Sequence, residues 1–561
     1  MKKKYFATKD LLYIIYVSFM LGALLASIEN GNWLIGFISF SFLFFLSLAI
    51  LTISSRLAIG AEWNEPSGES RRSAQTLGLI IALAFFLRLA VGMALHFGLP
   101  VYGHDDEDDR AGYVFTDAHR RDDQAWELAT SQLPVIDAFN QKYGSDQYGG
   151  LLAFNTAVYR YFSPDAHRPL ILILLSAFFA ALGVPFLWKA TSQVFGEKVA
   201  WASTWIFALY PDSILLGASA MREPYLLTFS AFAFLGFVHR FYRVEENASV
   251  SIRGDVLSLL KDRTGWIWIA LGLLGMLLVS PAIALVTIIV FAGWMFFNNE
   301  GREVSWRGIA GIAIVFLFSL LFLSSSLNRS GEFVATSPLH VINDWFQSAV
   351  KWDAYQLERD SGWVQKIFDE GPRWIRLPFV AVYGIFQPVL PATIIYPTKL
   401  IWKLIGILRA LSWYVILPML ILSFVAAAGQ ESRKMRNLIL WLSLLIWIWI
   451  LLAALRGGAD LFDNPRYRTI LFVWQSIIAG YVWVWWRETH NAWFSRIVVM
   501  EVVFLLFFMQ WYASRYFYWG GQLPFAAMVA LILGLWGIIL GVGLWRDKRS
   551  GAKAAMDKSR A

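Results

Sequence analysis

Residues 170–188 read LILILLSAFFAALGVPFLW and carry no charged side chain. A helix that crosses a bilayer needs about 20 mostly apolar residues. The stretch therefore predicts a membrane span, and it is one of about 14 such runs along the chain. The others lie at 11–27, 33–53, 77–97, 199–217, 224–238, 266–279, 281–297, 309–326, 401–428, 438–455, 470–486, 497–511 and 525–545.

The composition agrees with a polytopic membrane protein. Of 561 residues, 58% are hydrophobic and 16% are charged, whereas soluble domains carry about 25% charged residues. The 28 Trp residues suit the aromatic belts that form at both membrane interfaces. The absence of Cys excludes a disulfide framework, a thiolate nucleophile and a Cys-ligated metal.

Lys and Arg concentrate in the short loops on one side of this arrangement, as in cytoplasmic loops. Every short loop falls on the expected side if the N-terminus is inside, 14 helices span the membrane and Ser280-Pro281 is an outer turn. We therefore expect a multi-pass protein of the cell membrane (the plasma or inner membrane) with cytoplasmic N- and C-termini. The formal charge of +8 is spread over these loops, which argues against a nucleic-acid partner.

Two long segments then lie outside, at 100–168 and 327–399. The second contains a Pro-rich apolar piece, Phe379–Pro397, which predicts a short helix on or in the outer leaflet. We expect an all-α protein with two long outer-face loops that carry short amphipathic helices. The tail at 547–561 is basic, and we expect it to be disordered.

The first long outer segment is unusually acidic. Its run Asp105–Asp109 is typical of a solvated loop. The stretch at 122–129 reads DDQAWELA, and the apolar residues Trp126, Ala129 and Leu133 indicate a short amphipathic helix on the membrane. Carboxylates held there could act as a general base on an acceptor hydroxyl or amine, or could bind a divalent cation.

This stretch resembles the Asp-Glu-x-x-Tyr-x-x-Ala element of GT-C fold membrane glycosyltransferases, the group of protein mannosyltransferases and lipid A aminoarabinose transferases. Asp122 matches the invariant Asp, Asp123 stands for Glu and Trp126 for Tyr. Further stretches resemble family elements in the same order: DQYGG at 146–150 with VYRYF at 158–162, FGEKVA at 195–200, LYPDS at 209–213 with MREP at 221–224, and NPRYR at 464–468. The resemblance covers roughly 77–486.

The resemblance implies a GT-C-like bundle of about 12–14 transmembrane helices and a glycosyltransferase (a hexosyl or pentosyl transferase of GT-C type). Such an enzyme moves a sugar from a polyprenyl-phosphate-linked donor to a lipid, glycan or protein acceptor on the non-cytoplasmic face, with inversion at the anomeric carbon. By the match, Asp122 is the general base and Asp123 supports it. If a divalent cation such as Mg²⁺ or Mn²⁺ takes part, its expected ligands are Asp122, Asp123 and Glu223.

A leaving phosphate needs cationic stabilisation, for which the forked guanidinium of Arg is suited. We expect Arg222, Arg466 and Arg468 to contact the donor, although each could instead be an interfacial anchor. Glu223 is expected as a second acidic site residue, or as the ion-pair partner of Arg222. We also assign Tyr148, within the DQYGG stretch, to the substrate site.

Two other features have more than one interpretation. Arg88 lies deep in the run at 77–97, where a charge indicates function, pairing with a neighbouring helix, or a span that starts later than residue 77. His104, His119 and His167 share the first outer segment, but their spacing fits no fixed metal-ligand pattern.

These patterns divide the chain into five parts: 1–75 with two additional spans and a cytoplasmic loop, 76–330 as the GT-C-like catalytic region with the acidic loop at 99–168, 331–400 as the second outer loop, 401–546 as C-terminal spans and 547–561 as the tail.

Two other functions stay open. A lipid or glycan transporter or flippase would need paired inverted repeats and broken helices at the bilayer midplane. In a non-catalytic envelope assembly protein, the acidic loop would be a docking surface.

Overall fold

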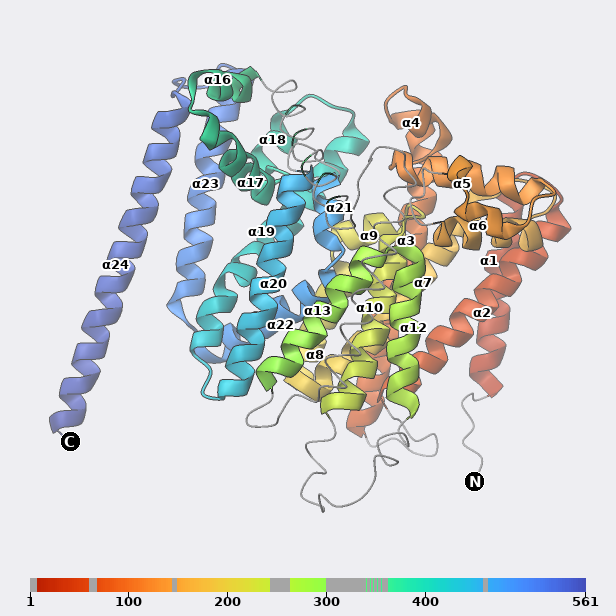
Figure 1. The fold of residues 1–561 in the computed structure, drawn as a ribbon, viewed down its shortest axis with the longest axis horizontal. Coiled ribbons are helices and arrows are strands. Elements are labelled where there is room, and N and C mark those ends of the chain that lie inside the picture. Colours follow the sequence, from red (N-terminus) through yellow and green to blue (C-terminus); the bar gives the residue numbers. More distant parts are fainter. Residues whose placement is uncertain are drawn as a thin grey trace, which may run out of the picture.

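The computed structural model describes residues 8–59, 68–143, 149–242, 263–298, 362–457 and 463–560, with single positions between 340 and 355. Regular structure in this part of the chain is helical, and no strand occurs in it. Eight of its helices are long and apolar enough to cross a membrane, or nine if one bent pair counts as a span. The chain is therefore an all-α polytopic membrane protein, as predicted (Figure 1).

Helices occupy the predicted spans wherever the structure describes them. The eight long helices are α1 (Thr8–Ile28), α2 (Trp33–Ile59), α3 (Gly68–Tyr102), α7 (Pro169–Phe195), α19 (Leu400–Ala428), α20 (Arg433–Gly457), α23 (Ala492–Tyr516) and α24 (Phe525–Arg560). Shorter helices fill four more: α10 (Glu223–Phe237), α12 (Arg263–Val279), α13 (Pro281–Asn298) and α22 (Phe472–Thr489). The break between α12 and α13 confirms the predicted turn at Ser280-Pro281, and the predicted span at 309–326 lies outside the described residues.

The span predicted at 199–217 is not one straight helix. It consists of α8 (Glu197–Leu209) and α9 (Pro211–Gly217), which are bent by 53°. Pro211 accounts for the break, because its nitrogen has no hydrogen to donate to the carbonyl four residues earlier.

This bend explains the buried charge of Arg88. The side chain is fully buried, and its Nη1 donates to the carbonyl oxygens of Ala84 at 2.9 Å and Ala208 at 3.0 Å. Its Nη2 donates to Ser213 Oγ at 2.9 Å, across the bend. Arg88 thus supplies a hydrogen bond to a carbonyl at the end of α8, where helical partners run out. Of the three interpretations of Arg88, the structure supports pairing with a neighbouring helix, since α3 already begins at Gly68.

One end of the bundle carries the short helices of both long loops, and we call it the loop end (Figure 1). The first loop contributes α4 (Glu107–Ala111), α5 (Thr116–Thr130) and α6 (Gly150–Phe162), which confirms the amphipathic helix predicted around Asp122. The second contributes α16 (Gly362–Glu370), α17 (Arg376–Phe386) and α18 (Leu390–Ile395), and α21 (Asp463–Thr469) lies at the same end. α1 begins and α24 ends at the opposite end (Figure 1).

The tail differs from the prediction of disorder at 547–561. α24 continues through it to Arg560. The reason lies in residues such as Ala, Lys and Met in this stretch, which have high helix propensity and prolong a helix that has already formed.

α7 is the most enclosed of the long helices, since 94% of the residues in its most apolar 18-residue stretch are buried. It packs against α2, α3, α8 and α10. Its first turn follows directly on residues 163–168, so this connecting segment is anchored at the loop end of the most buried helix. In α23 and α24, only 11% of the residues in the corresponding stretch are buried, and both helices lie at the rim of the bundle (Figure 1).

Candidate active site

Asp122 is a buried carboxylate that is surrounded by hydrogen-bond donors. Only 2% of the residue is exposed. The hydroxyl of Tyr159 donates to its Oδ1, and the hydroxyl of Tyr113 donates to its Oδ2. The Nε2 atom of His167 lies 3.3 Å from the same Oδ2. A carboxylate has about four lone-pair positions, so the three groups can surround one charge.

The two tyrosines stay protonated in this environment. Burial raises the pKa of both Tyr113 and Tyr159 well above the ordinary value, and the neighbouring charge of Asp122 raises it further. Both hydroxyls are therefore donors at any physiological pH. They donate one hydrogen bond to each oxygen of the Asp122 side chain.

Aromatic rings shape the space beside this carboxylate. Trp126, one turn further along α5, stacks on His167 with ring centroids 5.3 Å apart. Tyr159 meets both rings edge-on, at 5.6 Å from Trp126 and 5.2 Å from His167. The imidazole is thereby held between α5 and α6, with its Nε2 edge towards Asp122.

Asp123 faces a different environment from Asp122, because consecutive residues point in different directions on a helix. Its side chain is 61% exposed, and its Oδ2 lies 3.4 Å from Nε2 of His119. His119 Nδ1 contacts Asp108 Oδ1 at 2.7 Å. Partial burial raises the pKa of Asp123 above its ordinary value. The predicted carboxylate pair is thus divided between one buried and one exposed group.

A second polar cluster joins α5 to α21 and to the start of α10. Arg466 Nη2 donates to Asp117 Oδ2 at 2.8 Å, and its Nε lies 3.4 Å from Glu223 Oε1. Arg222 Nε is 3.7 Å from the same Glu223 oxygen. Burial alone would raise the pKa of Asp117, but the charges of Arg466, Arg121 and Arg222 outweigh burial and lower it.

Glu223 is the most deeply placed member of this cluster. It is fully buried, and neither carboxylate oxygen has a hydrogen-bond partner among the described residues. Its charge is balanced through the nearby guanidinium groups and not through hydrogen bonds. Buried polar atoms of this kind are rare in folded proteins and indicate a place where a further group can bind.

Arg468 lies on the same helix as Arg466 but deeper in the fold. Its guanidinium sits 3.4 Å from the centre of the Trp413 ring, and Nη1 donates to the carbonyl oxygen of Gln387 at 2.9 Å. Within the described chain, Nε and Nη2 of Arg468 are buried without a hydrogen-bond partner. Burial lowers the pKa of Arg468, and the nearby Tyr210 and Asp212 act in the opposite direction.

The structure brings together some of the predicted site residues. Arg222, Glu223 and Arg466 are in contact, whereas Asp122 belongs to the separate tyrosine–histidine group. Tyr148 lies outside the described residues. No three His, Asp or Glu side chains of the described chain are placed to hold a metal ion, so Asp122, Asp123 and Glu223 do not form such a set.

Comparison with known proteins finds similarity at the level of structure. No protein-family model matches the chain, and no curated protein sequence matches it. A solved structure of the archaeal oligosaccharyltransferase AglB from Archaeoglobus fulgidus, in complex with an inhibitory peptide and a dolichol-phosphate, is similar over 81% of this chain, with a TM-score of 0.38 and 14% identity. The similar region spans 54% of that chain, or about half of its length.

Sequence reasoning missed several groups of this site. Tyr113 carries no motif, Tyr159 lies in the VYRYF stretch at 158–162 but had no role assigned to it, and Asp117 was one of many acidic residues in its segment. His167 was considered only as a metal ligand. Its place directly before the Arg168-Pro169 start of a span is the one local signal that could have pointed to it, because that position fixes it at the membrane surface.

Proposed function

We propose that this protein is a membrane glycosyltransferase that moves a sugar from a polyprenyl-phosphate-linked donor to an acceptor at the loop end of the bundle. In this proposal the loop end is the non-cytoplasmic face, and both termini are cytoplasmic. The acceptor is a hydroxyl or amine of a lipid, a glycan or a protein. The transferred group is a hexosyl or pentosyl unit, and its anomeric carbon is inverted.

The observation that carries the proposal is that one helix, α5, reaches both polar clusters. Asp122 belongs to the acid–base group, and Asp117 contacts Arg466 at 2.8 Å. Five residues separate them, which corresponds to about 7.5 Å along a helix axis. In a displacement at a sugar carbon, the acceptor attacks on one side and the phosphate leaves on the other. At this spacing, the acid–base group can serve the acceptor and the cationic group can serve the phosphate.

The reaction balances with these groups. The acceptor oxygen or nitrogen attacks the anomeric carbon and loses its proton to the acid–base group at Asp122. The bond from that carbon to the phosphate oxygen breaks, and the lipid phosphate leaves with the electron pair. Arg466, Arg222 and Arg468 are the proposed phosphate contacts, since charge-assisted hydrogen bonds stabilise the negative charge that develops on the leaving group.

The buried Glu223 has a role in this scheme that a surface carboxylate would not have. It holds Arg466 and Arg222 close together when no phosphate is bound. When a phosphate arrives, two guanidinium groups already face the same space. Preorganised cations of this kind stabilise charge without reorganisation at the moment of reaction.

The test is donor consumption by the purified full-length protein in detergent. A panel of polyprenyl-phospho-sugars is offered with and without candidate acceptors, and Asp122→Asn serves as the matched variant. The proposal expects at least one donor to be consumed by the wild type and not by the variant. If no donor is consumed, or if the variant consumes it equally fast, the function is not glycosyl transfer at this site.

A further inference from the structure

We propose that His167 is the residue that takes the acceptor's proton and that Asp122 orients it. The turn between α1 and α2 keeps the His167 side chain in position relative to Asp122. This deepens the proposed function and rests on it. It also gives a role to the N-terminal helix pair, which lies outside the region that resembles glycosyltransferases.

Accessibility separates the two members of the pair. Asp122 is 2% exposed, and each of its oxygens already accepts a hydrogen bond from a tyrosine. An acceptor could reach this carboxylate only by displacing a tyrosine hydroxyl. The side chain of His167 keeps 28% of its surface exposed. Its Nε2 is buried 3.3 Å from Asp122 Oδ2 and makes no hydrogen bond in the present orientation of the ring. The histidine is therefore the member of the pair that an acceptor can touch.

The orientation of the ring fits an imidazole that works as a base. A small turn of the ring brings an Nε2–H into hydrogen-bond geometry with Asp122 Oδ2, which lies 3.3 Å away, and a neutral ring then leaves the Nδ1 lone pair on the other side. The carboxylate fixes this tautomer and stabilises the imidazolium that forms, as in other acid–base pairs of Asp and His. The stacked Trp126 ring prevents rotation out of this plane.

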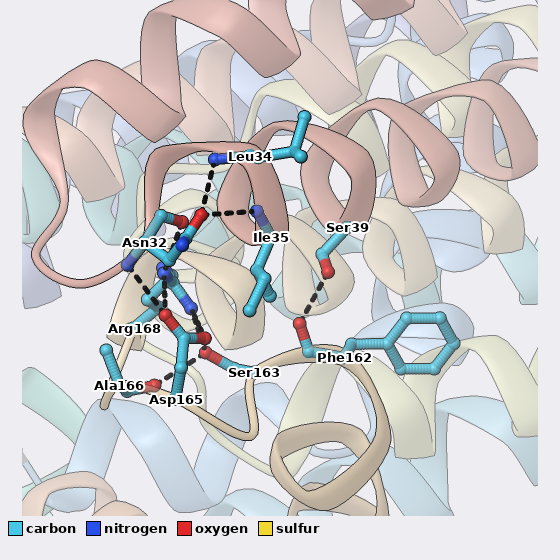
Figure 2. A network of polar contacts seen from close by, with 9 residues as sticks. All are labelled: Asn32, Leu34, Ile35, Ser39, Phe162, Ser163, Asp165, Ala166 and Arg168. Carbon is cyan, nitrogen blue, oxygen red and sulfur yellow. Dashed lines mark hydrogen bonds and ion pairs between the residues drawn. The ribbon is translucent and has the colours of Figure 1, made fainter.

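Figure 2 shows what holds the segment that carries His167. Asp165 accepts a hydrogen bond from the backbone N–H of Asn32 at 2.7 Å, and Arg168 Nη2 donates to the Asn32 carbonyl at 3.0 Å. Arg168 is 1% exposed and also pairs with Asp165 at 2.7 Å and with Ser163 Oγ at 2.9 Å. We call Asn32, Asp165 and Arg168 the clamp.

The turn between α1 and α2 and the first part of α2 each make one further contact with the same segment. Glu29 Oε1 accepts a hydrogen bond from the backbone N–H of Leu170 at 3.0 Å, in the first turn of α7. Ser39 donates to the carbonyl of Phe162, at the end of α6 (Figure 2). His167 thus lies between two fixed points, at residues 165 and 168. A shift of the α1–α2 turn would move the imidazole relative to α5, which carries Asp122.

The proton follows a balanced path. The acceptor O–H or N–H bond breaks as the acceptor binds the anomeric carbon, and the proton goes to Nδ1 of His167. The imidazolium then keeps its Nε2–H towards ionised Asp122. The leaving phosphate carries the electron pair of the broken bond, and the imidazolium later loses its proton to water.

Charges from several elements act on His167. Burial alone would lower its pKa, but Asp122 raises it, with smaller contributions from Asp123 and Glu29, and the net direction is upward. Removal of the Asp122 charge should therefore lower the pKa of His167.

The first test measures the interaction between His167 and Asp122 and needs no sugar donor. Diethyl pyrocarbonate acylates neutral imidazole, so labelling of the His167 peptide as a function of pH gives a midpoint by mass spectrometry. We expect a midpoint above about 6.5 in the wild type and a fall of roughly one pH unit or more in Asp122→Asn. The exposed His490 is the internal control and should not change. An unchanged His167 midpoint in Asp122→Asn would overturn the pair.

The second test uses turnover and separates catalysis from structure. His167→Gln should lower kcat by about 100-fold or more with little change in the KM for the donor. The wild-type rate should fall on acidification through the His167 midpoint, and this dependence should vanish in His167→Gln. Asp165→Asn should loosen the clamp and lower kcat, and Asp165→Glu should restore part of it.

The outcomes of the two tests are distinguishable. If the wild type consumes no donor, the proposed function fails and the catalytic role of His167 fails with it, whatever the labelling shows. If donor is consumed and His167→Gln keeps the wild-type kcat and pH profile, glycosyl transfer stands and His167 is not its base. If Asp165→Asn changes neither the labelling midpoint nor kcat, the clamp has no positioning role.

Discussion

Asp117 and Arg466 are 349 positions apart in the chain and meet at 2.8 Å. The contact joins α5, in the first long loop, to α21, directly before a late span. It links the helix that contains the DDQAWELA stretch at 122–129 to the helix that contains NPRYR at 464–468, two stretches that the sequence analysis considered separately. The side chain of Arg466 is only 5% exposed, whereas that of Asp117 is 43% exposed, so the pair lies at the border between the buried cluster and the loop surface.

Replacement of this arginine should impair donor use. In Arg466→Ala, the buried Glu223 loses a guanidinium at 3.4 Å, and the proposed phosphate contact is lost as well. A hydrogen bond to a charged group contributes about 1.5–3 kcal/mol, so we expect donor affinity to fall by roughly 10- to 100-fold. Initial rates at varied donor concentration measure it. Arg110→Ala, at a side chain that is 64% exposed in the first long loop, is the matched control and should behave like the wild type.

Asp122 should be indispensable for turnover but not for insertion into the membrane. Asp122→Asn keeps the volume and one oxygen that accepts from a tyrosine hydroxyl, yet it removes the negative charge. We expect transfer to fall by about 100-fold or more, with the amount of folded protein in detergent unchanged. Asp105→Asn changes a carboxylate whose side chain is 89% exposed, and it should leave the rate unaffected. Equal rates in the Asp122 variant and the wild type would exclude an acid–base role for Asp122.

The sequence predicted the spans well because the length of an apolar run directly reflects bilayer thickness. It also predicted the amphipathic helix around Asp122, because that pattern is local. The break at Pro211 was missed, since Pro is tolerated in membrane helices when a neighbour such as Arg88 supplies hydrogen bonds. The partners of Asp122 could not be predicted, because Tyr159 and His167 reach it from another helix and another connection. Such contacts depend on how α5, α6 and α7 pack together.

Glu29 should make the stability of the protein depend on pH near neutrality. Burial raises the pKa of its carboxyl to about 7, although the Leu170 N–H and the charge of Arg168 act in the opposite direction. A raised pKa in the folded state stabilises the fold below the unfolded value of about 4.3. This contribution is lost progressively as the pH rises to about 7.

Glu29→Gln removes this titration and keeps an oxygen for the Leu170 N–H. The difference in Tm between the variant and the wild type should therefore shift in favour of Gln between pH 4.5 and pH 7 (roughly the two pKa values) and stay constant above that range. Thermal unfolding in detergent across this range measures it. A difference that does not vary with pH would mean that Glu29 does not titrate in this window.

Gly31, in the same turn, should tolerate no side chain. Its φ is +96°, a conformation that L-residues rarely adopt. A Cβ built on it would lie 2.4 Å from the Cβ of Ala166 and 2.6 Å from Nη2 of Arg168. Gly31→Ala should therefore push the α1–α2 turn away from the clamp, with a strain of about 1–2 kcal/mol from the backbone alone.

The matched control is Gly78→Ala on α3, where a Cβ would meet no atom within 4 Å. We expect a lower Tm and faster labelling of His167 by diethyl pyrocarbonate in Gly31→Ala, and neither change in Gly78→Ala. Wild-type labelling of His167 in Gly31→Ala, together with a lowered Tm, would show that the turn stabilises the fold without controlling the position of the imidazole.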